Sequence, residues 1–200
     1  IKGGMNADGT VPVTEIWRNF GENVENSNQE WPLIAADENG AFQVLWLDDG
    51  NGDRDIFYQR FSEDWTDVGN PVKINDDVGS AAQRTPTIGA DVSGNFVITW
   101  IDERTGISDI YAQRYSSNGA TAGINFKVND DTGNMKQFNP AISVDAKGNF
   151  IVAWMDERNN RVCCYGDAED IYAQRYADDG TTLGANFRVN DGPEGVLKSS

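Results

Sequence analysis

The sequence predicts an all-β fold, a β-propeller built from four-stranded antiparallel blades of about 54 residues each. The first observation behind this prediction is a repeat, because Trp46, Trp100 and Trp154 follow one another at equal intervals along the chain. The second is that a proline stands at a fixed distance before each of these tryptophans. The third is the size of the unit, which is too small to bury a core of its own, so neighbouring units are expected to share one.

Each repeat reads as four short strands separated by turn residues. In the second repeat, PTIGADV and NFVITWIDE flank the turn Ser93–Asn95, and SDIYAQRYS and INFKVND flank the turn Ser117–Gly119. The strands are rich in β-branched and aromatic residues, which favour sheets. No part of the sequence has the i, i+3, i+4, i+7 apolar spacing of a long amphipathic helix. This pattern indicates one propeller blade per repeat.

The repeats divide the whole chain into about three and a half predicted blades. Residues 1–27 resemble the last two strands of a blade whose first half is absent, and residues 28–81 and 82–135 form two blades. Residues 136–195 form a third blade with a seven-residue insertion, and residues 196–200 start a next one. Because propellers close with 4 to 8 blades, we expect a segment of a larger chain, or closure with another copy.

The blade motif resembles the repeats, roughly 50 residues long, of large secreted or surface proteins from Bacteroidetes-type bacteria, with the consensus W-x-D-x-R, D-I-Y-A-Q-R-Y and F-x-V-N. The most specific matches are Trp100–Arg104 with Asp109–Tyr115, and Trp154–Arg158 with Asp170–Tyr176. The first repeat departs from the consensus at Leu47–Gly50. The resemblance implies a β-propeller in an extracellular or cell-surface setting, and it implies no particular reaction.

The composition excludes several classes of function. The chain has 32 acidic and 16 basic residues, a net charge of −16, and no histidine. Such a surface repels nucleic acids and anionic lipid, so nucleic acid is not an expected partner. No run approaches the ~20 apolar residues of a membrane helix, so we expect no membrane insertion. The missing histidine excludes Ser-His-Asp and Cys-His catalysis, and any histidine-ligated metal, within this chain.

Aspartate and arginine recur with the tryptophans in successive repeats. The recurring set is Asp48, Asp102, Asp156, Arg60, Arg114, Arg175, Arg104 and Arg158. Arginine–carboxylate pairs can clamp a substrate acid or a sugar by two-point hydrogen bonding. A catalytic site, however, is built once per propeller, whereas these residues appear blade after blade. We therefore predict that they hold blades together, and that the recurring tryptophans pack between blades.

A calcium loop is one prediction for the corner after the first tryptophan. Asp49, Asn51, Asp53 and Asp55 place oxygen-bearing side chains at alternate positions, as calcium loops do. The glutamate expected at position 12 of a full loop is replaced by Ser62, so an ordinary polar hairpin is the alternative. Calcium is the one cofactor that the sequence suggests.

The insertion in the third repeat is the clearest break in the pattern. It carries two adjacent cysteines, which could form a vicinal disulfide, remain free thiols or bridge to another chain. Loops carry binding function in propellers, so the insertion is predicted as a contact surface, with a tolerated surface insertion as the alternative. The predicted contact residues are Cys163, Cys164, Tyr165, Asp167 and Glu169.

Two functions follow from these observations. The first is a non-enzymatic extracellular module that binds a protein or a glycan, or that assembles with copies of itself through open blade edges. The alternative is a propeller-type hydrolase related to glycosidases or sialidases, with carboxylates on loops near the axis. The candidate acids of that hydrolase are the non-repeating residues Glu63, Asp64, Asp167 and Glu169.

Overall fold

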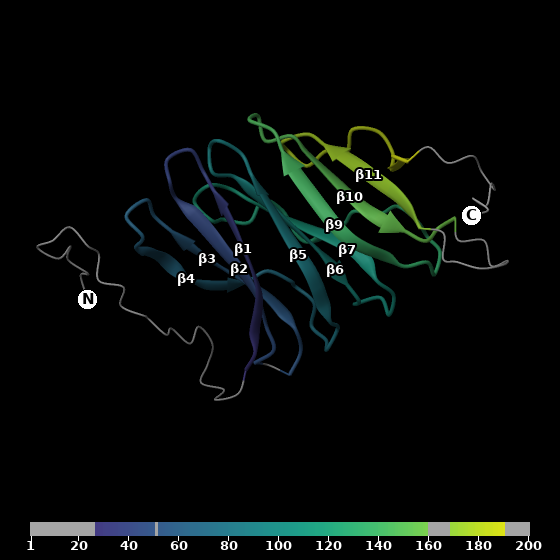
Figure 1. The fold of residues 1–200 in the computed structure, drawn as a ribbon, viewed down its shortest axis with the longest axis horizontal. Coiled ribbons are helices and arrows are strands. Elements are labelled where there is room, and N and C mark those ends of the chain that lie inside the picture. Colours follow the sequence, from purple (N-terminus) through teal and green to yellow (C-terminus); the bar gives the residue numbers. More distant parts are fainter. Residues whose placement is uncertain (1–26, 51, 160–168, 191–200) are drawn as a thin grey trace, which may run out of the picture.

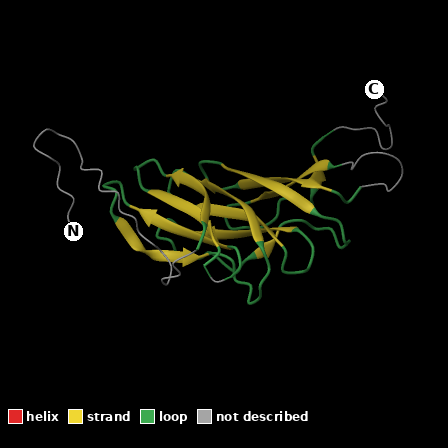
Figure 2. Cartoon of the chain, turned by 60° about the horizontal axis from the view of Figure 1, so that its bottom comes forward, coloured by secondary structure: helices red, strands yellow, loops and turns green. Residues whose placement is uncertain are grey.

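The computed structural model describes residues 27–50, 52–159 and 169–190, and these form three four-stranded antiparallel sheets. Blade 1 contains β1 (Gln29–Ala36), β2 (Phe42–Asp48), β3 (Asp55–Phe61) and β4 (Asp67–Lys73). Blade 2 contains β5 (Gln83–Ala90), β6 (Phe96–Asp102), β7 (Asp109–Tyr115) and β8 (Phe126–Lys127). Blade 3 contains β9 (Gln137–Val144), β10 (Phe150–Asp156), β11 (Asp170–Tyr176) and β12 (Phe187–Arg188). Figure 2 shows only strands and loops in this part of the chain.

The first strand of each blade lies on the inner side of the array. Within a sheet the strands follow chain order, so β1, β5 and β9 are edge strands. β1 contacts β5, and β5 contacts β9, so these edges come together (Figure 1). β9 also packs against β6 and β7 of the preceding blade. We call β1, β5 and β9 the inner strands.

The two ends of a blade differ in what they carry. One end holds the turns after the first and third strands, and we call it the hairpin end. At this end, Asp91 Oδ1 accepts hydrogen bonds from the backbone N–H groups of Ser93 (2.8 Å) and Asn95 (2.9 Å). Gly94 completes the turn with a φ of 82°, a conformation that favours glycine. The opposite end joins the second and third strands and leads to the next blade, and we call it the connection end.

Apolar side chains from neighbouring blades form shared cores. Trp100 of blade 2 packs in one core with Leu45 and Ile56 of blade 1. Trp154 of blade 3 packs in the second core with Ile110 of blade 2. Both tryptophans are buried, and they donate their indole N–H groups to Asp102 and Asp156 at 2.8 Å. The predictions that blades share cores and that these two tryptophans pack between blades are therefore confirmed.

Arginines join the blades at the connection end. Arg104 pairs with the buried Asp102 of its own blade at 2.8 Å and with Asp76 of the link from blade 1 at 2.6 Å. Arg158 forms the equivalent pairs one blade later. Each guanidinium also lies over a tyrosine ring, with Arg104 4.3 Å from the centroid of Tyr111.

A second set of arginines joins the blades at the hairpin end. The Arg60 guanidinium of blade 1 donates to the backbone carbonyl of Ser117 in blade 2. The Arg114 guanidinium of blade 2 donates to the carbonyl of Asp178 in blade 3 at 2.8 Å. Recurrence of these arginines therefore reflects a recurring contact between blades, as predicted from the sequence.

Blade 3 exposes the face that blade 2 buries. On this face, blade 3 carries the apolar side chains of Ile151, Met155, Ile171 and Val189, and we call these four residues the terminal face. Ile171 is 37% exposed and Val189 is 52% exposed. The equivalent side chains of blade 2, which blade 3 covers, are all buried. The terminal face therefore corresponds to the face of blade 2 that packs against blade 3.

Candidate functional site

A β-bulge interrupts each inner strand at the residue before its proline. The strand pairing shifts register between Glu30 and Leu33 in blade 1, and similarly in the other two blades. At the centre of these bulges stand Trp31, Thr85 and Asn139, with φ angles of 59°, 49° and 49°. We call these three residues the inner-strand bulges.

The bulge backbone is unusual for such side chains. A positive φ is disfavoured in residues other than glycine, and it is an outlier for bulky or β-branched ones. Bulges of this kind redirect a side chain, and they concentrate at rims and near active sites. The backbone is the same in three blades while the side chain changes from Trp31 to Thr85 to Asn139. A constant frame with variable side chains is typical of a binding surface.

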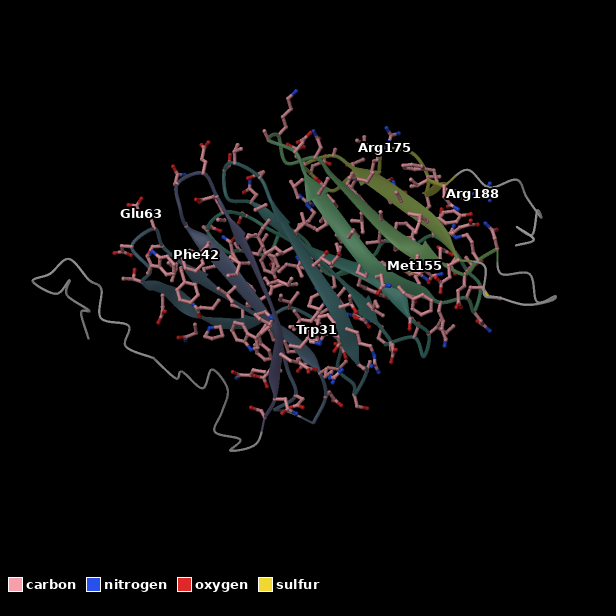
Figure 3. The ribbon with its side chains drawn as sticks, in the orientation of Figure 1. Trp31, Phe42, Glu63, Met155, Arg175 and Arg188 are labelled. Atoms are coloured by element: carbon pink, nitrogen blue, oxygen red, sulfur yellow. The ribbon has the colours of Figure 1, made fainter. Side chains whose placement is uncertain are left out.

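Trp31 is the most prominent side chain of this set. It lies on β1 near the connection end, and 58% of it is exposed (Figure 3). Asn139 is exposed on β9, and its amide Nδ2 lies 3.1 Å from Met155 Sδ. Thr85 lies between them in sequence, on the middle inner strand. An aromatic ring and two short polar side chains are therefore available on neighbouring inner strands.

Ion pairs flank the inner-strand bulges at the connection end. Glu30 pairs with Arg54 at 2.9 Å, and Arg84 pairs with Glu103 at 3.4 Å. Ser108 Oγ lies 3.3 Å from the same Glu103 carboxylate. The ion-paired groups are partly exposed, so they can exchange their partners for the hydroxyl groups of a ligand.

Two described members of the predicted calcium loop, Asp49 and Asp55, have partners within the protein, and Asp53 is partly buried beside them in sequence. Asp49 accepts hydrogen bonds from the backbone and side chain of Asn28, which lower the pKa of its carboxyl. Asp55 is buried, where Lys73 lies 2.8 Å away. Asn51 lies outside the described residues. In the described part of the chain, no three acidic, cysteine or histidine side chains are grouped to hold a metal, and calcium binding stays a prediction.

Most of the predicted insertion surface lies outside the described residues. This applies to Cys163, Cys164, Tyr165 and Asp167. Glu169 is described, and it is exposed immediately before β11 at the connection end of blade 3.

Of the candidate hydrolase acids, Glu63, Asp64 and Glu169 are described, and the structure does not bring Glu169 together with the other two. Glu63 and Asp64 lie in the turn between β3 and β4, at the hairpin end of blade 1. Glu169 lies at the connection end of blade 3. Hydrogen bonds from Ser62 and Thr66 lower the pKa of the Asp64 carboxyl, which suits a turn residue better than a general acid. These described acids therefore do not form a catalytic pair.

A pocket of about 230 Å³ lies at the hairpin end between blades 2 and 3. Its walls include Asp91, Arg114, Lys147 and Asp178. It is smaller than typical ligand sites, which measure about 300–1,000 Å³. The Arg114 guanidinium is already bound to backbone carbonyls of blade 3. The pocket is therefore a by-product of blade packing rather than the first candidate for a site.

The sequence prediction missed the inner-strand bulges. Their signal is the residue before the recurring proline, which reads Trp-Pro, Thr-Pro and Asn-Pro in the three repeats. A residue before proline is expected to be extended, so a left-handed conformation there is not anticipated from local rules.

Comparison with known proteins gives matches only among solved structures, because no protein-family model and no curated protein matches the chain. The GH93 α-L-arabinofuranosidase of Fusarium graminearum, in complex with arabinobiose, aligns with 79% of this chain and 49% of its own. The identity is 8% and the TM-score is 0.56. The same enzyme with an iminosugar inhibitor aligns over the same shares, at 9% identity and a TM-score of 0.53.

The fold is that of a β-propeller. An endo-arabinase from Bacteroides thetaiotaomicron also aligns, over 70% of this chain and 54% of its own, at 16% identity and a TM-score of 0.43. At these identities the likeness shows the fold alone. The chain spans about half the length of the solved structures it matches. Among the described residues, no helix is both long and apolar enough to cross a membrane.

Proposed function

We propose that this chain is a glycan-binding segment of a β-propeller of the glycoside hydrolase type, and that a sugar chain lies across the inner-strand bulges. The observation that carries the proposal is the exposed indole of Trp31, which a strained backbone position holds on the inner strand of blade 1. An aromatic ring offers a flat apolar surface to the ring of a sugar, while nearby polar groups bind its hydroxyls.

The neighbouring side chains support a glycan rather than an apolar ligand. Thr85 and Asn139 can both donate and accept hydrogen bonds, and they occupy equivalent places on the next two inner strands. Arg84 and Glu103 add charged hydrogen-bonding groups at the same end of the blades. A row of one aromatic and several polar groups fits an extended oligosaccharide. The fold likeness to an arabinofuranosidase makes arabinose-containing oligosaccharides the first ligands to test.

Binding of labelled oligosaccharides to the chain and to two variants tests this proposal. Trp31→Thr introduces the residue found at the same bulge of blade 2, so the fold should tolerate it. The affinity of this variant for the oligosaccharides should be about tenfold lower than that of the parent chain, or lower still, and tenfold corresponds to about 1.4 kcal/mol of binding free energy. Asn139→Ala should weaken binding by a smaller factor, and Val78→Ala, at an exposed site between blades 1 and 2, should leave it unchanged. Equal affinity of the chain and Trp31→Thr for all saccharides that bind would refute the site.

Hydrolysis is an extension of the same proposal, supported by the glycoside hydrolase fold of the solved neighbours. It requires two carboxylates about 5–9.5 Å apart around the glycosidic bond. The acids beside the inner strands are Glu30, Glu103 and Glu157. Catalysis is supported if the chain releases reducing sugar from an oligosaccharide and if Glu103→Gln or Glu157→Gln abolishes this release while the variant still binds the oligosaccharide. If the chain binds oligosaccharides but releases no reducing sugar, it is a binding module and not a hydrolase on its own.

Assembly is a second candidate, favoured by the terminal face. Its exposed apolar side chains correspond to those that blade 3 covers in blade 2, so a further blade of the same repeat fits it. We propose that the assembled propeller acts outside the cell, as the resemblance of the repeats to those of secreted proteins implies. Light scattering over a concentration series tests self-association, and a monomer at every concentration would oppose assembly of the isolated chain.

A further inference from the structure

A buried polar cluster lies where the chain passes from blade 2 to blade 3. Its centre is the side-chain amide of Asn129, which is 3% exposed. The Nδ2 atom lies 2.9 Å from Asp109 Oδ1 and 2.9 Å from Gln137 Oε1, and it also contacts Asp131 Oδ1. Three acceptors therefore converge on one nitrogen, which carries only two hydrogens. We call Asp109, Asn129, Asp131 and Gln137 the junction cluster.

Two atoms of the junction cluster are buried without a hydrogen-bond partner among the described residues. These atoms are Gln137 Nε2 and Asp131 Oδ2, and the whole Gln137 side chain is fully buried. The other terminal atom of each side chain contacts Asn129 Nδ2, so both unpartnered atoms belong to groups that meet at one place. Buried polar groups in folded proteins nearly always bond to protein or to ordered water.

The same two positions are unpartnered one blade earlier. Gln83 and Asp77 stand at the repeat positions of Gln137 and Asp131. Gln83 is fully buried, and in the described part of the chain neither of its amide atoms has a partner. The Oδ2 atom of Asp77 has none there either, while its Oδ1 atom lies 2.6 Å from Asn75 Nδ2. Because the pattern recurs at two junctions, it belongs to the repeat rather than to one side chain.

The hydrogen-bonding character of the unpartnered atoms selects the ligand. Asn129 Oδ1 accepts the backbone N–H of Ile110 at 2.8 Å, so its Nδ2 atom must face Gln137 Oε1. The Nε2 atom of Gln137 is therefore a donor that needs an acceptor, whereas Asp131 Oδ2 is an acceptor. A metal cation cannot accept a hydrogen bond, and an anion such as chloride cannot donate one. Water does both and is small enough for a buried site.

A lysine gives a second reason against a metal ion. Lys127 Nζ lies 2.7 Å from Asp109 Oδ1 and 3.3 Å from the backbone carbonyl oxygen of Asp131. Lys73 forms the equivalent pair with Asp55 at 2.8 Å. Each junction thus carries its own ammonium group, which repels a divalent cation at short range.

We propose that the junction cluster binds one water molecule, which accepts a hydrogen bond from Gln137 Nε2 and donates one to Asp131 Oδ2. Gln83 and Asp77 hold its counterpart in the preceding junction. Buried waters with several polar partners are part of a fold and are costly to remove. This water joins the link after blade 2 to the first strand of blade 3. The site is separate from the inner-strand bulges, so the proposal does not depend on glycan binding.

Contacts between water and the side-chain amide protons of the ¹⁵N-labelled chain test the site. Rotating-frame cross-peaks suit this test, since their sign separates a direct contact from proton exchange. Gln113 is the matched control, because it is 2% exposed and both of its amide atoms are bonded, Nε2 to backbone carbonyls and Oε1 to Asn125 Nδ2. We expect a contact with water at Gln137 and Gln83 and none at Gln113. Gln137→Met and Gln83→Met identify the two signals by their loss.

A crystal structure that resolves water molecules is the second measurement, and it needs no variant. Density for a water within hydrogen-bond distance of both Gln137 Nε2 and Asp131 Oδ2 supports the proposal. A direct hydrogen bond between these two atoms, or a metal ion at this place in crystals grown with calcium chloride, overturns it. So does a water contact in solution that is equally strong at Gln113 and Gln137, or absent from Gln137.

Discussion

Arg158 Nη1 lies 2.7 Å from Asp130 Oδ1, and this pair joins blade 3 to the link that leaves blade 2. The same guanidinium lies 2.8 Å from Asp156 Oδ2, a carboxylate that is fully buried. Arg104 repeats both contacts one blade earlier. One side chain therefore neutralises a buried charge within its blade and reaches across the junction. Removing it should affect stability far more than removing an exposed arginine.

Arg158→Ala is expected to lower the free energy of unfolding by about 3–5 kcal/mol, because it leaves Asp156 buried without its cation. Urea unfolding followed by tryptophan fluorescence measures the change. Arg175→Ala is the matched control, since this arginine lies on the exposed side of blade 3 and should cost less than about 0.5 kcal/mol. Similar losses in the two variants would contradict the role of Arg158 at the junction.

The same pair predicts a pH dependence. Burial raises the pKa of the Asp156 carboxyl, but hydrogen bonds from Arg158 and Trp154 outweigh burial and hold the pKa below its usual value. A depressed pKa in the folded state stabilises the protein above the unfolded value of about 3.9, and this stability is lost as pH falls through the folded pKa. Melting temperatures from about pH 7 to about pH 2 should therefore fall less steeply in Asp156→Asn than in the parent. If the melting temperatures of Asp156→Asn and of the parent fall in parallel with pH, Asp156 does not contribute to the pH dependence of stability.

Gly119 should be more sensitive than Gly123 to the same substitution. Both residues have a positive φ, 85° and 92°, so alanine strains either turn by about 1–2 kcal/mol. Only at Gly119 would the new Cβ meet Arg60, whereas nothing lies within 4 Å of a Cβ at Gly123. Gly119→Ala should therefore lower the free energy of unfolding further than Gly123→Ala. The difference between the two variants in chemical denaturation measures the displaced contact, and equal losses would show that Arg60 moves aside freely.

Ile110 and Ile171 are equivalent residues on an internal and a terminal blade. Ile110 is fully buried between blades 2 and 3, and Ile171 is 37% exposed on the terminal face. Ile110→Asp buries an unpaired charge and should cost more than about 4 kcal/mol, whereas Ile171→Asp should cost about 1 kcal/mol or less. Thermal unfolding of both variants checks this difference. A large loss in Ile171→Asp would mean that the terminal face is covered in solution.

The repeat pattern predicts the fold well because it is a property of the whole chain. A constant repeat length and alternating strands already imply four-stranded blades with shared cores, and the structure confirms both. The structural role of the recurring arginines was also predictable, since residues that recur in every blade meet the same neighbours. A fourth strand in each blade was predicted as well, but the structure confines β8 and β12 to two residues each, a shortness that the sequence pattern did not indicate.

The candidate site was harder to predict from the sequence, because the backbone conformation of the bulges determines which side chains are presented there. Nothing in the composition of Trp-Pro, Thr-Pro and Asn-Pro indicates a positive φ, which arises from the bulge that the sheet imposes. Trp31 could have been found by aligning the three repeats, where it stands in the place of Thr85 and Asn139. Attention to long insertions directed the prediction to residues 159–169 instead. Single substitutions within a repeated frame were the better signal.

The arginine contacts at the junctions also bear on how such arrays change length during evolution. Arg104 and Arg158 contact their neighbours through the same atoms, one repeat apart. A duplicated repeat would arrive with its own guanidinium and present its own acceptor carboxylate to the next unit. Recombination between repeats can therefore add or remove a blade while each surviving junction stays chemically complete. The variable positions, Trp31 among them, are then free to diverge one unit at a time.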